Sequence, residues 1–338
     1  MDLTAAYELT VAGQSVPVGP RLVSLSLEEK RGAEADTLEL VLSDHDGRLA
    51  IPPEGAVVTL ALGWKGRALV NKGRFTVDDV EHAGTPDQLT VRARSGDFTS
   101  GFRVRKERSF RQTTLGAVLA QIAGEQGLQA AVAPELAGIA VPVLGQSRLS
   151  DSALLAKLGK DHDAVAAVKG GRLIFSPIGR GSTVSGRQLP TVTITREGGD
   201  GHRYARAKRE AYEGVEAGYH DVKAGKRETV KSDNPAKGPA ASDPKDPAGK
   251  GVKRIRKTFA SREAAERAAK SEASRSARAE RTFGLNLARG RPELAPEQRV
   301  RVEGFKREID AQTWLIASAS HKLDGGGGLQ TSLEMESG

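Results

Sequence analysis

The stretch TLELVLS at residues 37–43 decides the fold class, because Leu38, Leu40 and Leu42 alternate there with mostly polar residues. Successive side chains of a β-strand point to opposite faces of the sheet, so these three leucines face a core on one side. Val41 is the apolar residue of the opposite face and is therefore a candidate contact for a partner. The stretch predicts a half-buried strand of an antiparallel sheet.

Working outward from this strand, similar short segments recur through the first third of the chain. Turn-forming stretches such as Asp44-His45-Asp46-Gly47 and Pro52-Pro53-Glu54-Gly55 separate them. The predicted strands are 22–27, 38–42, 57–62, 74–80 and 89–93. Their spacing is typical of a small barrel, and we assign residues 1–100 to a first tube-like β-barrel.

The hydrophobic period changes after residue 95. Thr113 or Thr114 can cap a helix that ends near Gly127, and a second helix begins near Ser150 or Asp151. Inward-facing positions of these helices are Leu115, Val118, Leu119, Ile122, Leu154, Leu155 and Leu158. Two strands follow, joined at residues 170–171, where two glycines suit the positive φ angles of a hairpin turn. Residues 101–180 are therefore expected to form a small α/β domain.

Strand patterns return in residues 181–338, which we assign to a second tube-like β-barrel. The predicted strands are 191–195, 204–212, 214–222 and 252–259, with a further set after Phe283. A flexible exposed loop is expected at 231–251, where almost no apolar side chain is available for burial. The longest helix is expected at 261–282, capped by Ser261 and packed on its own barrel.

The predicted fold class is thus mainly β with an α+β insertion: two antiparallel tube-like β-barrels plus a small α/β domain. The two strand-rich ends are candidates for similar barrels whose sequences have diverged, although no tandem repeat is visible.

The composition suits a soluble globular protein, with 38% hydrophobic and 28% charged residues, and no apolar run is long enough to cross a bilayer. The N-terminus shows no secretory signal pattern, so we expect synthesis in the cytoplasm. The absence of cysteine excludes disulfides, zinc–thiolate sites and cysteine nucleophiles.

The net charge of +8 is unevenly distributed along the chain. Acids exceed bases by five in residues 1–100, whereas bases exceed acids by five in 101–200 and by eight in 201–338. This segregation favours subunits that meet through complementary surfaces.

The motifs that could carry chemistry have simpler interpretations. Residues 44–47 resemble the start of a calcium loop but lack its later acidic ligands, so they are expected to form a turn. The six histidines, with Asp161-His162-Asp163 as a local cluster, lack paired metal spacing, and no G-x-S-x-G motif is present. Residues 325–328 are expected to form a flexible hairpin connection. We therefore predict no catalytic, cofactor-binding or metal-binding residue and no enzymatic activity.

Basic runs at 203–209 and 253–257 leave a second hypothesis open, a basic nucleic-acid-binding regulatory protein. Aromatic residues make up only 4% of the chain and do not alternate with these runs, so solvated or interfacial strands are the favoured interpretation. A third hypothesis, an enzyme that degrades cell walls, would require a hydrolase module, and the sequence shows none.

Three stretches in order resemble the phage late control D family of contractile-tail baseplate hub proteins, found in phages and R-type bacteriocins. The first runs from Thr113 to Leu128, and the second covers 150–158 with 168–175. The third joins 261–268 to 300–305 and 331–336.

The resemblance implies a homotrimer whose six barrels form a ring and adapt a sixfold tail tube to a threefold central spike. The implied partners are the spike protein, the tail tube or tube-initiator protein, and baseplate wedge or tape measure proteins. Neither a specific nucleic acid nor a small-molecule substrate is implied. The implied location is the tail baseplate of a virion or bacteriocin particle, assembled in the cytoplasm of the bacterial host.

Overall fold

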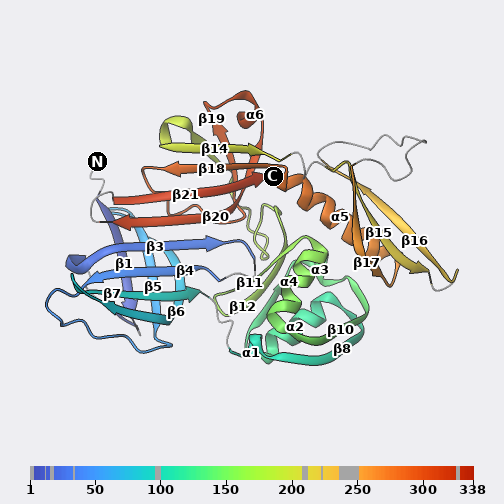
Figure 1. The fold of residues 1–338 in the computed structure, drawn as a ribbon, viewed down its shortest axis with the longest axis horizontal. Helices are drawn as coiled ribbons and strands as arrows, with labels where there is room; N and C mark the ends of the chain where they lie inside the picture. The colour runs from blue at the N-terminus through green and yellow to red at the C-terminus, as the bar shows by residue number, and fades with distance from the viewer. Residues whose placement is uncertain are drawn as a thin grey trace.

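The structure is a computed structural model that describes residues 4–11, 13–15, 19–32, 35–95, 100–207, 212–221, 224–235, 251–324 and 328–338. It is mainly β with an α/β insertion, as the sequence predicts (Figure 1). Among the described residues, no helix has the length and apolar character needed to cross a bilayer.

The N-terminal third forms all five predicted strands, with longer bounds, and adds two more at its start. Each long strand alternates buried and less buried residues, which is why the leucine pattern was informative. The elements are β1 (Ala5–Val11), β2 (Gln14–Ser15), η1 (Gly19–Arg21), β3 (Leu22–Lys30), β4 (Thr37–Ser43), β5 (Val57–Trp64), β6 (Val70–Ala83) and β7 (Gln88–Ser95).

The middle segment forms the expected helices and hairpin. The side chains of Thr114 and Ser150 accept hydrogen bonds from Ala117 N and Ala153 N at the two helix starts. The elements are α1 (Ser100–Arg103), β8 (Arg105–Thr114), α2 (Leu115–Glu125), β9 (Gln129–Val132), α3 (Pro134–Ala137), β10 (Ala140–Ser150), α4 (Asp151–His162), β11 (Ala164–Lys169) and β12 (Arg172–Pro177). Gly170 and Gly171 have φ of 58° and 72° in the β11–β12 turn.

The C-terminal segment contributes a second group of strands and an inserted arm. The strand group contains β13 (Val192–Thr195), η2 (Arg196–Gly198), β14 (Gly201–Arg206), β18 (Arg281–Leu287), β19 (Arg299–Glu303), α6 (Arg307–Asp310), β20 (Thr313–Asp324) and β21 (Gly328–Ser337). The arm, inserted between β14 and β18, contains β15 (Gly214–Asp221), β16 (Lys226–Asp233), β17 (Val252–Phe259) and α5 (Arg262–Ala279).

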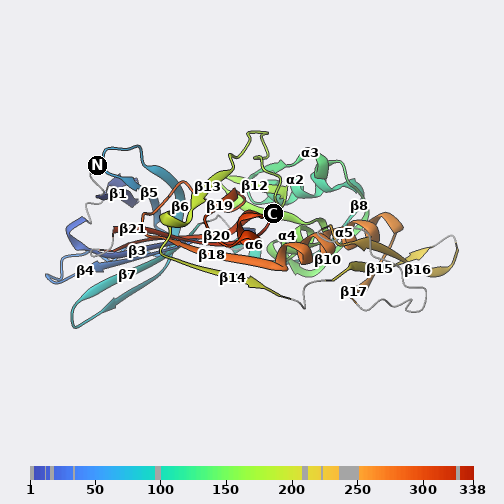
Figure 2. The same cartoon turned by 90° about the horizontal axis from the view of Figure 1, so that it is seen from above.

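The two strand-rich regions belong to one 13-stranded sheet, a joint that the sequence does not reveal. Its main path is β14-β18-β21-β20-β3-β4-β7-β6-β5-β1-β2, and β19 extends from β20 to β13. The joint is the antiparallel pair of β3 and β20, which lie side by side in Figures 1 and 2. Leu323 and Leu329 from the C-terminal strands also pack into the core of the N-terminal strands.

The two strand groups are topological counterparts, which we call unit 1 (β1, β3–β7) and unit 2 (β13, β14, β18–β21). The counterparts are β1 and β13, β3 and β14, β4 and β18, β5 and β19, β6 and β20, β7 and β21. Both β6 and β20 bend at an extra residue, Asp78 in one and Ala317 in the other. One difference is that β1 runs antiparallel to β5, whereas β13 runs parallel to β19.

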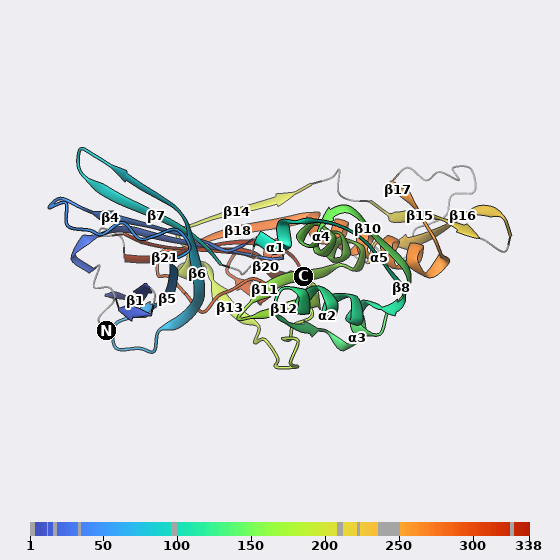
Figure 3. The ribbon, with the colours of Figure 1, turned by 90° about the horizontal axis from the view of Figure 1, so that it is seen from below.

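The arm corrects the expectation that strands 214–222 and 252–259 belong to the second barrel. They form a separate three-stranded sheet with order β16-β15-β17. Helix α5 packs its alanine stripe, including Ala265 and Ala269, against Val215 and Tyr219 of that sheet. The expectation that this helix packs on the barrel holds only for its C-terminal end, where Arg278 pairs with Glu336 of β21, because the small residues fit the arm's own sheet. Figure 3 shows the arm extending away from unit 1.

Several predicted bounds also differ from the structure. The helix ends at Ala279, because Thr282 already pairs with Ala205 and Glu336 in the large sheet. The loop expected from residue 231 begins later, because residues 231–233 complete β16. Residues 236–250, 208–211, 222–223 and 325–327 of the predicted segments lie outside the described residues.

Replacing Trp314 with alanine should destabilise the protein by about 3–5 kcal/mol, because its fully buried ring lies in the core of unit 2. Its indole N–H, which donates to Ile309 O at 3.1 Å, would also be lost. Denaturant unfolding should show this loss as a lower midpoint. Val143→Ala, at a side chain that is 69% exposed, is the control and should change the midpoint little.

Candidate assembly surface

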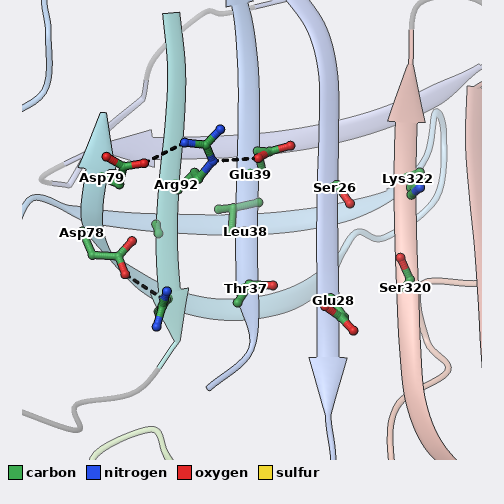
Figure 4. A pocket seen from close by; sticks show the side chains of 12 residues that line it. Ser26, Glu28, Thr37, Leu38, Glu39, Asp78, Asp79, Arg92, Ser320 and Lys322 are labelled. Atoms are coloured by element: carbon green, nitrogen blue, oxygen red, sulfur yellow. Dashed lines mark hydrogen bonds and ion pairs between the residues drawn. The ribbon is translucent and has the colours of Figure 1, made fainter. Parts of the chain in front are cut away.

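Eight strands of the sheet, from β14 to β6, share one polar face opposite the cores of the two units. The alternation in each strand produces this face, since Ser26 lies between buried Leu25 and Leu27, and Glu334 between buried Leu333 and Met335. The outward side chains are serine, threonine or charged residues over most of this surface. Figure 4 shows the part of it that crosses β6, β7, β4, β3 and β20.

Ion pairs between neighbouring strands cover this part of the polar face. Arg92 Nε lies 2.9 Å from Glu39 Oε2, and its Nη1 lies 2.7 Å from Asp79 Oδ2 (Figure 4). Arg94 Nε lies 2.7 Å from Asp78 Oδ2. Because all these groups are substantially exposed, each pair is screened by solvent and contributes little to stability. Together they line a hollow of about 480 Å³ with charged groups.

A buried polar cluster lies beneath the β3–β20 joint. Lys72 Nζ donates to Glu29 Oε2 at 2.5 Å and lies 3.1 Å from His321 Nε2. His321 Nδ1 lies 2.9 Å from Thr331 Oγ1. The cluster joins β6, β3, β20 and β21, so it fixes the two units against each other.

The protonation states of this cluster follow from burial and hydrogen bonding. Burial lowers the pKa of His321, although its contact with Glu29 acts in the other direction. Burial alone would raise the pKa of Glu29, but hydrogen bonds from His321 and Lys72 outweigh it and leave the pKa below its ordinary value. Burial also lowers the pKa of Lys72. The cluster thus favours an ionised Glu29 and a neutral His321.

A second ionic network ties the middle segment and α5 to the sheet. Arg278 pairs with both Asp163, at the end of α4, and Glu336 of β21, the latter at 2.9 Å. Arg31 pairs with Glu336 and with Glu297, whose carboxylate lies 2.5 Å from Arg31 Nε. The turn after β3, the α/β segment and the C-terminal strand therefore meet at one point.

The eight-strand part of the sheet, from β14 to β6, ends in two strand edges that have no strand partner within the described chain. One is the 78–83 part of β6, which pairs only with β7 after β5 diverges near Val77. The other is the outer edge of β14, which pairs only with β18. Unpaired edges of this kind are ready to accept another strand.

The motifs singled out in the sequence occupy structural positions. Asp44 accepts a hydrogen bond from Leu49 N at 3.0 Å and lies near His82, and Asp46 pairs with Arg21 at 2.6 Å, so this stretch is a turn. Gly328 begins β21, while the rest of the predicted glycine connection lies outside the described residues. Within the described ranges, no three His, Asp or Glu side chains gather as a possible metal site.

The basic run 253–257 lies on β17 of the arm and is largely paired with acids. Lys253 lies 2.6 Å from Glu272, and Lys257 lies 3.3 Å from Asp161. In the run 203–209, Arg206 contacts the buried carboxylate of Glu280 at 3.1 Å. The described residues of the two runs lie in different sheets, β14 of the large sheet and β17 of the arm.

The cluster of Lys72, Glu29 and His321 was not identified from the sequence. A signal existed, because His321 occupies an inward position of its strand, between Ala319 and Leu323. Such a histidine requires a buried polar partner. The partners come from distant segments, so only the strand pairing reveals them.

The thermal stability of the protein should fall on acidification between about pH 7 and 5. His321 titrates near 6.5 when unfolded and lower when folded, so the unfolded state binds more protons as the pH falls. His321→Gln should therefore reduce the drop in melting temperature over this range. The residual drop should reflect His162, whose pKa burial also lowers. His220→Gln, at an exposed histidine, is the control, and a slope unchanged in His321→Gln would contradict this assignment.

Comparisons with known proteins agree on the class of this chain. The family model for the phage tail baseplate hub (GPD) matches residues 34–326. Probable baseplate hub proteins of Escherichia phages P2 and 186 are 40% and 39% identical, each over 99% of this chain and 93% of the relative. The 43 kDa tail protein of prophage MuSo2 from Shewanella oneidensis has a similar fold, with a TM-score of 0.70 at 14% identity over 97% of both chains. The chain therefore belongs to the phage tail baseplate hub family.

Proposed function

We propose that this baseplate hub protein is a homotrimeric adaptor that joins the sixfold tail tube to the threefold central spike. The observation that carries the proposal is the pair of topologically matched units in one sheet, whose eight strands from β14 to β6 have an open edge at each end. Three copies joined head to tail bring together six units. Such a ring offers six similar positions to a tube and three identical positions to a spike.

The two open edges favour a closed ring of chains. They argue against a dimer whose two chains are related by a twofold axis. They are different strands, so joining one to the other gives a heterologous contact that repeats around a ring. Closure pairs both of these edges and removes surfaces that would otherwise promote aggregation. The β3–β20 joint within one chain provides a model for that contact. It joins β20, the counterpart of β6, to β3, the counterpart of β14.

The polar face of the eight strands is suited to line the ring. Its serine, threonine and paired charged side chains hold water, whereas the opposite faces are occupied by the two cores. In this proposal the mechanism is geometric and not enzymatic: the hub transmits force and aligns the tube with the spike. Spike, tube-initiator and wedge or tape measure proteins are its proposed contacts in the virion tail, after assembly in the host cytoplasm.

The purified protein should behave as a particle of three chains in native mass spectrometry. Class averages from electron microscopy should show rings with threefold symmetry, which carry a single spike when the neighbouring spike gene is co-expressed. Persistent monomers that bind DNA in a salt-dependent manner and never the spike would favour the regulatory alternative.

A further inference from the structure

We infer that, within the proposed trimer, the β6 edge of one copy pairs with β14 of the next copy in a register that sets Glu81 opposite Ala205. The occupant of each open edge is thus a second copy of this chain. The inference rests on the proposed function for the trimer itself, and on the internal symmetry of one chain for the register.

The first step aligns β6 with β20. The extra residue lies at Asp78 in one strand and at Ala317 in the other, and Val80 and Ala319 then face Val91 and Leu333 of the neighbouring strands. The hydrogen bonds beside the bend agree, because Val77 N donates to Ala56 O just as Ile316 N donates to Gln298 O. Glu81 is therefore the counterpart of Ser320, and His82 that of His321.

The second step aligns β14 with β3. Leu40 pairs with Val91 in unit 1, and Leu285 pairs with Leu333 in unit 2, so Leu40 and Leu285 are counterparts. Their outer neighbours are Leu25 in β3 and His202 in β14. Glu28 lies three residues after Leu25, and Ala205 lies three residues after His202, so Ala205 is the counterpart of Glu28.

The third step transfers the register of the internal joint. There, Ser320 pairs with Glu28 and His321 pairs with Leu27. The corresponding pairs between copies are Val80 with Arg206, Glu81 with Ala205, His82 with Tyr204, and Ala83 with Arg203. All of these residues belong to the described strands.

Burial shows that these edges lack a partner. His321 is fully buried at the internal joint, whereas its counterpart His82 leaves 41% of its side chain exposed. Leu25 is buried in β3, whereas its counterpart His202 in β14 is exposed. A strand paired in this register would cover the His82 side chain, which lies opposite Tyr204.

Charge favours joining the two edges to each other over joining either edge to its own copy. The β6 edge carries Asp78, Asp79 and Glu81, which also contact Arg92 and Arg94, while β14 carries Arg203 and Arg206, the latter in contact with Glu280. Pairing two β6 edges would place acids opposite acids, and pairing two β14 edges would place arginines opposite arginines. The like-charge contacts disfavour a twofold dimer and leave the head-to-tail contact.

The protein contains no cysteine, so the register can be tested by disulfide formation. The bond from Arg31 N to Ala317 O implies that Ser320 and Glu28 form a non-hydrogen-bonded pair, the type with Cα atoms about 4.5 Å apart. That separation permits a disulfide. The double variant Glu81→Cys/Ala205→Cys should therefore yield covalent dimers and trimers on a non-reducing denaturing gel.

Two further double variants serve as the positive and the negative control. Ser320→Cys/Glu28→Cys should form a disulfide within one chain, without any larger species, which shows that this strand geometry supports the bond. Glu81→Cys/Arg203→Cys shifts the pairing by two residues along the same face and should give little covalent oligomer. Mixing the single variants Glu81→Cys and Ala205→Cys should give covalent dimers only, since each chain then has one cysteine.

The outcomes separate the register from the trimer. Particles of three chains that form the shifted disulfide, or neither disulfide, would overturn the register and leave the proposed trimer intact. Chains that remain monomeric in native mass spectrometry would overturn both. Trimers covalently joined through positions 81 and 205, with the shifted pair unjoined, would establish the contact.

Discussion

The pairing of β3 with β20 is the contact on which the rest of the structure depends. It joins residues 24–30 to residues 318–324, so it can form only when nearly the whole chain is in place. Without it the two units would be separate small sheets, and neither the eight-strand polar face nor the matched open edges would exist. Contacts of such long range are associated with slow folding.

Buried polar side chains hold the joint in one alignment, which a hydrophobic contact alone would not do. Glu29, Lys72 and His321 are buried where the two units meet, and each has its hydrogen-bond partner in another strand. A buried polar group without its partner is costly, so a slipped register would be penalised at this point. The cluster thus specifies alignment more than it adds stability.

The sequence predicted local structure well because local structure depends on neighbouring residues. Thr114 and Ser150 start helices through their own side chains, and the leucine alternation of 38–42 fixes which face of its strand is buried. The assignment of strands to sheets failed for the arm, since strand patterns say nothing about which strands pair. Val215 and Phe259 were equally suited to a barrel or to the alanine face of α5, and only the packing decides between them.

The arm lies between β14 and β18, at the position where unit 1 has only the short turn between β3 and β4. Both flanking strands keep their pairing on either side of it, and Arg278 near the end of α5 is the residue that ties the arm to β21. Loop length itself adds little free energy once the ends are fixed. The strands of the arm can therefore change in length at little cost to the large sheet, as long as the end of α5 keeps its contact with Glu336.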